Sequence, residues 1–167
     1  MDRSGNVVLT GFMGTGKSTV GRLLADLLGY EFVDTDDLIE QGHGPISTIF
    51  GEQGEDAFRE LEREVARDLA GRDRLVISTG GRMMLDPQNA STLGATARVF
   101  CLVATPETIA ARVLDGPARP LLAGPEPLRR IRALLAERAA GYSQFEQVVT
   151  DERTAADIAG DLAARIV

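Results

Sequence analysis

The stretch Gly11-Phe12-Met13-Gly14-Thr15-Gly16-Lys17-Ser18 combines glycines, a lysine and a hydroxyl residue at the spacing of a phosphate-binding P-loop. Glycines adopt positive φ angles and let the backbone approach an anion, so the N–H groups of the loop would point at phosphate oxygens. Lys17 would reach the β- and γ-phosphates, and the Ser18 hydroxyl would ligate Mg²⁺. The alternative is a chance glycine-rich turn. An apolar run before the stretch and an amphipathic segment after it favour a nucleoside triphosphate site.

Lys17 is also the only lysine among the 18 lysine and arginine residues of the chain. A lysine ammonium is a compact point charge, whereas a guanidinium is a wide planar fork. The position of this one lysine inside the predicted P-loop favours a functional reason over chance.

Two aspartates, Asp34 and Asp36, follow the second predicted strand, residues 30–33. Two residues apart in an extended chain, both carboxylates would face the same way. Beside a P-loop, one could hold Mg²⁺ while the other accepts a proton from an attacking hydroxyl. The alternative is a solvated strand end or a helix N-cap, a position that aspartate favours. We favour the functional interpretation.

Two arginines occupy informative positions on predicted helices. Arg138 continues the apolar stripe of a helix that starts near residue 128, and a desolvated guanidinium needs an anionic partner. That partner is either a structural carboxylate or the carboxylate of a bound substrate. Arg59 precedes Glu62 by three residues, close enough for the glutamate to orient it. For either arginine alone, a structural or surface ion pair explains the pattern as well.

Two loops complete the candidate site. Thr79-Gly80-Gly81, after the third predicted strand, offers a backbone without side chains in the way of a ligand, although a simple turn explains it equally well. Arg119 lies in residues 116–127, which are rich in Gly, Pro and Ala and have the composition of a lid. A lid arginine would neutralise charge on a transferring phosphoryl group and help to exclude water.

The overall composition limits the possible function classes. A chain of 167 residues fits one domain, and its net charge of −7 argues against a nucleic-acid binder. Neither a membrane span nor a signal peptide is expected. Cys101 lies in an apolar run and is expected to be a buried thiol, and the absence of a disulfide framework favours a cytoplasmic location. His43 lies in a Gly/Pro-rich turn, and we expect no catalytic role for it.

Hydrophobic periodicity predicts the elements that must position these residues. Strands alternate with helices, which predicts an α/β fold with a parallel sheet and helices on both faces. In such a sheet, ligands bind beyond the carboxyl ends of the strands. Strands are expected at residues 7–9, 30–33, 75–77, 99–103 and 148–149. The main helices are expected after the P-loop up to a stop at Gly29, from 37 onward, at 54–69, from 106, from 128, and at 155–166.

Taken together, these residues resemble the shikimate kinases of the nucleoside monophosphate kinase-like P-loop group. The resemblance runs nearly end to end, and the order and spacing of its motifs are specific. It covers the P-loop, Asp34-Thr35-Asp36, Gly-Glu-x-x-Phe-Arg-x-x-Glu at residues 54–62, Gly80-Gly81, Arg119-Pro120-Leu121-Leu122 and Arg138-x-x-x-Tyr142.

The resemblance implies a single three-layer αβα P-loop kinase domain over residues 1–167, with a five-stranded parallel sheet in the order 2-3-1-4-5. It implies a lid at about 116–127 and a substrate-binding helical region at about 37–70. The family transfers the γ-phosphate of ATP to the 3-hydroxyl of shikimate, a step towards chorismate and the aromatic amino acids. Mg²⁺ is the implied cofactor, ATP and shikimate are the implied partners, and a monomer is expected.

On the nucleotide side, the resemblance implies that the P-loop binds the ATP phosphates and that Asp34 helps Ser18 to hold Mg²⁺. Arg112 would pack against adenine, Arg153 would lie in the late adenine-side loop, and Arg119 would reach ATP across the closed lid. The implied ATP-binding residues are Gly14, Thr15, Gly16, Lys17, Ser18, Thr19, Arg112, Arg119 and Arg153.

On the acceptor side, the resemblance implies that Asp36 binds the shikimate hydroxyls and acts as the base. Arg59 and Arg138 would clamp the carboxylate, and the Gly80-Gly81 turn would contact the substrate through the Gly81 amide. The implied catalytic residues are Lys17, Asp36 and Arg119.

The sequence departs from the family pattern at Arg82, where the family usually has a third glycine. The arginine side chain could enter the acceptor pocket or point to solvent. Residues 42–45 are also slightly short against the usual pattern. Two alternatives therefore stay open: a kinase of the same fold for another small polyhydroxylated acid, and a ligand-sensing relative without turnover.

Overall fold

The computed structural model describes residues 5–114, 122 and 124–166, which fold around one five-stranded sheet. The strand order is β2-β3-β1-β4-β5 and every neighbouring pair is parallel, which confirms the predicted sheet. The strands are β1 (Asn6–Thr10), β2 (Glu31–Asp34), β3 (Leu75–Ser78), β4 (Ala97–Val103) and β5 (Glu146–Val149).

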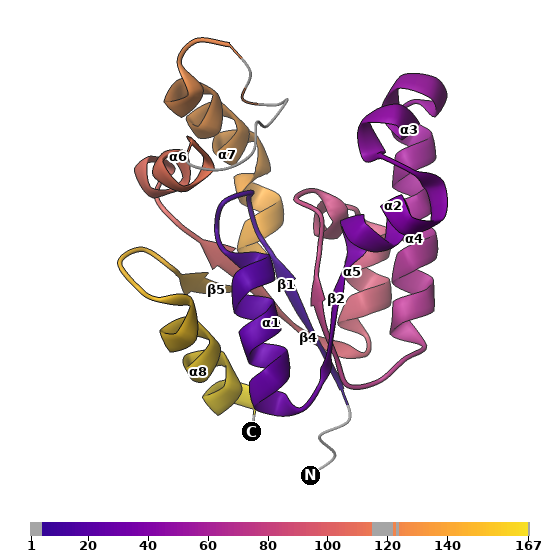
Figure 1. The fold of residues 1–167 in the computed structure, drawn as a ribbon, viewed down its shortest axis with the longest axis vertical. Coiled ribbons are helices and arrows are strands. Elements are labelled where there is room, and N and C mark those ends of the chain that lie inside the picture. Colours follow the sequence, from indigo (N-terminus) through magenta and orange to yellow (C-terminus); the bar gives the residue numbers. More distant parts are fainter. Residues whose placement is uncertain (1–4, 115–121, 123, 167) are drawn as a thin grey trace.

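Helices cover both faces of this sheet (Figure 1). They are α1 (Lys17–Leu28), α2 (Thr35–His43), α3 (Ile46–Gln53), α4 (Glu55–Ala70), the short 3-10 helix η1 (Met83–Leu85), α5 (Pro87–Gly94), α6 (Pro106–Leu114), α7 (Pro127–Ser143) and α8 (Ala155–Ile166). Among the described residues, no helix combines the length and apolar character needed to cross a membrane.

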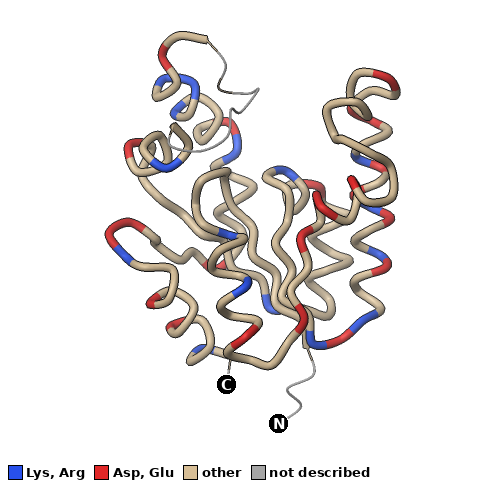
Figure 2. The backbone as a smooth tube through the Cα atoms, viewed as in Figure 1, with Lys and Arg blue, Asp and Glu red and all other residues tan. Residues whose placement is uncertain are grey.

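The central strand β1 shows why the sheet is buried on both sides. All five of its residues are buried, and successive side chains point to opposite faces. Val7 and Leu9 join the core formed with α1 and α8, whereas Val8 joins the core formed with α4 and α5. The three central residues of β1 are all apolar, as expected for a strand of a parallel sheet that is covered on both faces. Charged residues accordingly gather on the helices and loops (Figure 2).

The segment after β2 differs from the prediction. The helix begins at Thr35 instead of residue 37, because the Asp34 side chain caps its first turn. It runs through Gly42 to His43. The helix ends where Gly44 adopts a φ of 84°. The predicted substrate-binding region at about 37–70 therefore consists of three helices, α2, α3 and α4.

The arrangement of the helices defines one end of the molecule. In Figure 1, α2 and α3 rise on one side of the carboxyl ends of the strands, and α6 and α7 rise on the other. Of the predicted lid at 116–127, residues 116–121 and 123 lie outside the described residues. Leu122 is buried in the core that includes Phe12 and Ile131.

Candidate active site

The P-loop connects β1 to α1 and presents bare backbone donors. Gly16 caps α1 in the left-handed conformation, with a φ of 96°, and no side chain caps the N-terminus of the helix. The first N–H groups of the helix therefore stay available to an anion. The loop is internally braced, because the Thr15 hydroxyl donates to the Phe12 carbonyl over 2.7 Å. Lys17 Nζ donates to the Gly11 and Phe12 carbonyls at 2.7 and 3.1 Å, so the ammonium lies across the loop.

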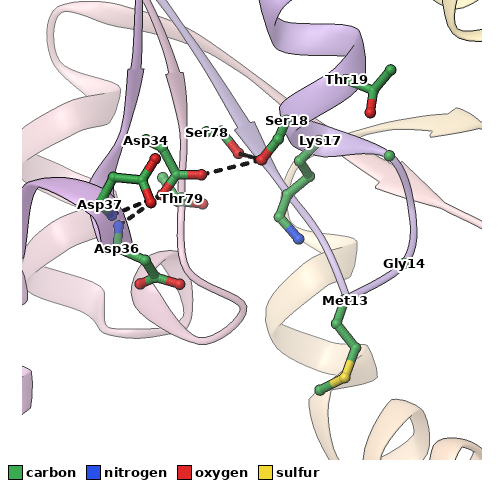
Figure 3. A pocket seen from close by; sticks show the side chains of 11 residues that line it. Met13, Gly14, Lys17, Ser18, Thr19, Asp34, Asp36, Asp37, Ser78 and Thr79 are labelled. Carbon is green, nitrogen blue, oxygen red and sulfur yellow. Dashed lines mark hydrogen bonds between the residues drawn. The ribbon is translucent and has the colours of Figure 1, made fainter. Parts of the chain in front are cut away.

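A pocket of about 380 Å³ opens beside this loop. Figure 3 shows Lys17 and Ser18 on one side of it and Asp34 and Asp36 on the other. The P-loop and the carboxyl ends of β2 and β3 therefore share one cavity, as expected for a parallel sheet. Its lining residues are Met13, Gly14, Gly16, Lys17, Ser18, Thr19, Asp34, Asp36, Asp37, Ser78 and Thr79.

Asp34 uses its two carboxylate oxygens for different purposes. Oδ1 accepts hydrogen bonds from the backbone N–H groups of Asp36 and Asp37 at 2.9 and 3.1 Å, whereas Oδ2 accepts from Ser18 Oγ at 3.1 Å. The predicted extended chain from Asp34 to Asp36 is wrong, because Asp36 lies in the first turn of α2. For Asp34, a role as helix N-cap and a role at the active site are compatible, because the oxygen that caps α2 leaves the other oxygen directed at the P-loop.

The pairing of Ser18 with Asp34 fits a magnesium site. A hydroxyl and a carboxylate oxygen lie side by side at the P-loop, and Mg²⁺ prefers oxygen ligands from one or two side chains together with phosphate and water. Within the described part of the chain, no cluster of three or more His, Cys, Asp or Glu residues could hold a metal.

Asp36 is half-buried at the edge of the pocket and has an unusual affinity for protons. Burial, and next the neighbouring charge of Asp34, raise the pKa of Asp36 to about 6, although Lys17 acts in the opposite direction. A carboxylate that titrates this close to neutral pH can accept a proton from a hydroxyl more readily than an ordinary aspartate.

The Gly80-Gly81 turn brings the acceptor-side residues together. A Cβ atom on Gly80 would lie 2.8 Å from Asp36 Oδ1 and 3.2 Å from Glu62 Oε2. A Cβ atom on Gly81 would lie 3.3 Å from Arg138 Nη1. A side chain at Gly80 would therefore displace the Asp36 carboxylate, and one at Gly81 would press against the Arg138 guanidinium.

Arg138 is buried on α7, with 5% of its surface exposed, as the apolar stripe predicts. Its guanidinium lies 5.3 Å from the centre of the Phe12 ring, and its Nε has no hydrogen-bond partner among the described residues. Over residues 5–114, 122 and 124–166, no carboxylate lies within ion-pair distance of it. Because an uncompensated buried charge is costly, this guanidinium favours a bound anion over a structural carboxylate.

Arg59 forms the ion pairs that were the alternative explanation for it. Its Nη1 lies 2.7 Å from Glu62 Oε1, and its Nη2 lies 3.2 Å from Glu55 Oε1. Glu62 is buried, and burial raises its pKa even though Arg59 opposes the shift. Arg59 is therefore connected to the Gly80-Gly81 turn through Glu62, whose other oxygen approaches Gly80.

Two of the arginines expected to bind ATP, Arg112 and Arg153, form hydrogen bonds with other parts of the protein. Arg112 donates to the Gly14 carbonyl at 3.2 Å and to the Thr150 hydroxyl and carbonyl at 3.1 and 3.0 Å, so it joins α6 to the P-loop and to the end of β5. Arg153 donates to the Val149 carbonyl and to Asp161. Arg119 lies outside the described residues.

Arg82 and two other residues are readily placed. Arg82 is exposed and has an ordinary φ of −108°, so its position does not require glycine, although its charge still acts on the Tyr142 hydroxyl. Cys101 is a buried thiol, as expected, and burial raises its pKa to about 11. His43 is exposed.

Two residues of the site had no role assigned from the sequence. The Thr35 hydroxyl accepts a hydrogen bond from the Gly80 N–H at 3.1 Å, and the Tyr142 hydroxyl donates to the Gly81 carbonyl at 2.5 Å. Tyr142 formed part of the motif with Arg138, and its spacing of four residues on a helix was the available signal.

Comparison with known proteins gives a consistent result. The family model described as "Shikimate kinase" matches residues 13–167. A protein named shikimate kinase from Symbiobacterium thermophilum is 44% identical over 166 residues, covering 96% of this chain and 95% of the relative. One of the same name from Thermus thermophilus is 43% identical and covers 96% and 89% of the two chains.

Solved structures agree with these relatives. The structure of shikimate kinase from Acinetobacter baumannii in complex with shikimate is similar, with a TM-score of 0.89, 36% identity and coverage of 97% of this chain and 92% of that one. A gluconokinase from Sinorhizobium meliloti, with a TM-score of 0.67 and 20% identity, shares the fold. It covers 97% of this chain and 91% of that one.

Proposed function

Because the chain belongs to the shikimate kinase family, we propose that it transfers the γ-phosphate of ATP to the 3-hydroxyl of shikimate. The observation that supports this acceptor best is the buried Arg138 guanidinium, which has no described carboxylate partner and adjoins Gly81. A small acid with ring hydroxyls would supply the missing carboxylate. Its hydroxyls would then face Asp36 on the other side of the same turn.

In the proposed reaction, the 3-hydroxyl oxygen forms a bond to the γ-phosphorus while the bond from that phosphorus to the bridging oxygen of ADP breaks. Asp36 accepts the hydroxyl proton, a role supported by its raised pKa. Lys17 and the backbone N–H groups of the P-loop stabilise the phosphate oxygens. Phosphoryl transfer asks mainly for positioning and charge stabilisation, and these residues offer both.

Mg²⁺ is part of the proposal, with Ser18 and Asp34 as its protein ligands. The ion would neutralise charge on the β- and γ-phosphates. Asp34 keeps its capping bonds to α2 through the other oxygen, so it would present the metal-facing oxygen in a fixed direction.

The remaining assignments extend the proposal to the rest of the site. Arg112 and Arg153 would contact the adenine side of ATP, Arg119 would reach the phosphates from the lid, and Arg59 would assist Arg138 at the carboxylate. A monomer is the proposed oligomeric state. A cytoplasmic location completes the proposal.

An ADP-release assay tests the acceptor directly. The enzyme is given Mg-ATP alone or with shikimate, quinate or gluconate, and we expect strong stimulation by shikimate only. Stimulation by another acid alone would establish a different acceptor. Binding of both ligands without ADP release would establish the ligand-sensing alternative and overturn the proposal.

A further inference from the structure

We propose that Tyr142 is a positioning residue for the acceptor: its hydroxyl anchors the Gly80-Gly81 turn, so that the Gly81 N–H and the Arg138 guanidinium meet the same bound acid. This inference rests on the proposed function for the identity of the acid. The anchoring of the turn can be tested without it.

The hydrogen bonds of the turn leave one donor unused. The Gly80 N–H donates to the Thr35 hydroxyl at 3.1 Å, and the Gly80 carbonyl accepts from the Met83 N–H at 3.1 Å. The Gly81 carbonyl accepts from the Tyr142 hydroxyl at 2.5 Å. In the described part of the chain, the Gly81 N–H has no acceptor. The turn is therefore held at three polar groups while the fourth stays available to a ligand.

Tyr142 and Arg138 reach this turn from the same helix. They are four residues apart on α7 and hence on one face of it, and both are buried. A Cβ atom on Gly81 would lie 3.3 Å from Arg138 Nη1 and 3.9 Å from the Tyr142 hydroxyl. One hydrogen bond from Tyr142 therefore sets the distance between the free amide and the guanidinium.

Close packing of the backbone supports this connection. A Cβ atom on Gly141 would lie 2.3 Å from Leu85 Cδ2, so α7 approaches η1 as closely as glycine allows, one residue before Tyr142. Beyond it, Gln147 Nε2 donates to the Tyr142 carbonyl at 2.6 Å. The tyrosine is thus held at its backbone while its hydroxyl reaches the turn.

Tyr142 acts through the turn because its hydroxyl proton is already committed to the Gly81 carbonyl. Burial raises the pKa of Tyr142, although hydrogen bonding to the Arg138 side chain, and next the Arg138 charge, oppose the shift, so the hydroxyl remains a donor at neutral pH. Removing the hydroxyl would release the turn and the contact of the hydroxyl with the Arg138 side chain, while both groups assigned to the substrate, the Gly81 N–H and the Arg138 guanidinium, stay in the protein.

The test compares Tyr142→Phe with Tyr30→Phe, a change at the only other tyrosine, which lies just before β2 and packs against Arg74. Calorimetric titration of the full chain gives Kd values for shikimate and for ATP. We expect Tyr142→Phe to weaken shikimate binding about five- to tenfold, as loss of one buried hydrogen bond does, and to change ATP binding less than twofold. Tyr30→Phe should change neither value.

Amide hydrogen exchange of the ligand-free protein provides the second measurement. We expect the Gly80 N–H to exchange about fivefold or more faster in Tyr142→Phe than in Tyr30→Phe, because the adjoining anchor is lost. An unchanged Gly80 exchange rate would overturn the inference, as would an unchanged Kd for shikimate or an equal loss of ATP affinity. If the wild-type protein does not bind shikimate, the proposed function fails. Faster Gly80 exchange would then still support the anchoring role.

Discussion

The two halves of the active site are built in different ways. On the nucleotide side, one continuous stretch, residues 11–19, supplies the loop backbone, the lysine and the serine hydroxyl. On the acceptor side, the converging groups come from α2, α4, the turn after β3 and α7, and they span residues 36 to 138. The phosphate-binding part of the nucleotide side therefore follows from one strand–loop–helix unit, whereas the acceptor side forms only when the whole fold has assembled.

This difference predicts how the two halves respond to mutation. Changes in the P-loop should disturb phosphate chemistry for any acceptor. Changes around the Gly80-Gly81 turn should alter acceptor binding and leave ATP binding nearly unchanged. The predictions below test that separation, beginning with the largest expected effect.

Lys17→Met should reduce kcat about 10³-fold or more, because the ammonium that stabilises the transferring phosphoryl group is lost. The ADP-release assay with saturating shikimate measures the effect. Circular dichroism and Tm should stay close to wild type, which would show that the fold is intact. Turnover within tenfold of wild type would contradict the role given to Lys17.

Asp36→Asn should lower kcat by about 10²- to 10³-fold and yet stabilise the protein at alkaline pH. The folded-state pKa of Asp36 is raised to about 6, above the ordinary 3.8, so the native protein holds this proton more tightly than the unfolded chain. The wild type therefore loses stability as the pH rises from about 4 through 6. Removing the charge should raise the free energy of unfolding by roughly 1–3 kcal/mol at pH 8 and change it little at pH 4.

Urea unfolding of wild type and Asp36→Asn at pH 4 and pH 8 measures that difference. In the wild type, kcat/KM for shikimate should fall as the pH drops below about 6, because protonated Asp36 can no longer accept a proton. If Asp36→Asn changed the free energy of unfolding equally at both pH values, burial of the Asp36 charge would not be the cause of the change.

Arg138→Ala should raise KM for shikimate about 10- to 100-fold, because a buried charge-assisted contact to the carboxylate is lost. KM for ATP should change less than threefold. Arg132→Ala is the matched control, because Arg132 lies on the same helix, is exposed and pairs with Glu107. An increase in KM for both shikimate and ATP would contradict the prediction that the acceptor side and the nucleotide side respond to mutation independently.

Arg82→Gly should have the smallest effect, less than twofold on kcat/KM for shikimate or quinate. The Arg82 side chain is exposed and its backbone conformation is ordinary, so glycine gains neither space nor freedom in the folded state. A modest loss of stability, about 0.5–1 kcal/mol, is expected from the more flexible unfolded chain. A tenfold change in acceptor preference would establish Arg82 as a specificity residue.

The same contrast explains how much the sequence could predict. The P-loop and the burial of Arg138 follow from local patterns, and the sheet order follows from the resemblance to the family; the structure agrees with the sheet order and with the burial. The course of the chain at Asp34 was mispredicted, because aspartate serves both as a helix cap and as a ligand and spacing alone does not separate these uses.

Other features depend on contacts between distant segments. The exposed position of Arg82, the approach of Glu62 to Gly80 and the bond from Tyr142 to Gly81 join residues that no local period connects. Only packing of α4 and α7 around the turn determines them. The roles of Arg112 and Arg153 at adenine stay predictions.

The position of Lys17 gives this protein a built-in reporter. Its ammonium rests on the Gly11 and Phe12 carbonyls at the mouth of the pocket, and no other lysine exists in the chain. Reductive methylation with ¹³C-formaldehyde would therefore label one side chain, besides the α-amino group, without mutagenesis. The resulting pair of signals would allow nucleotide arrival and departure to be followed by NMR through the one side chain that we propose exchanges loop carbonyls for phosphate.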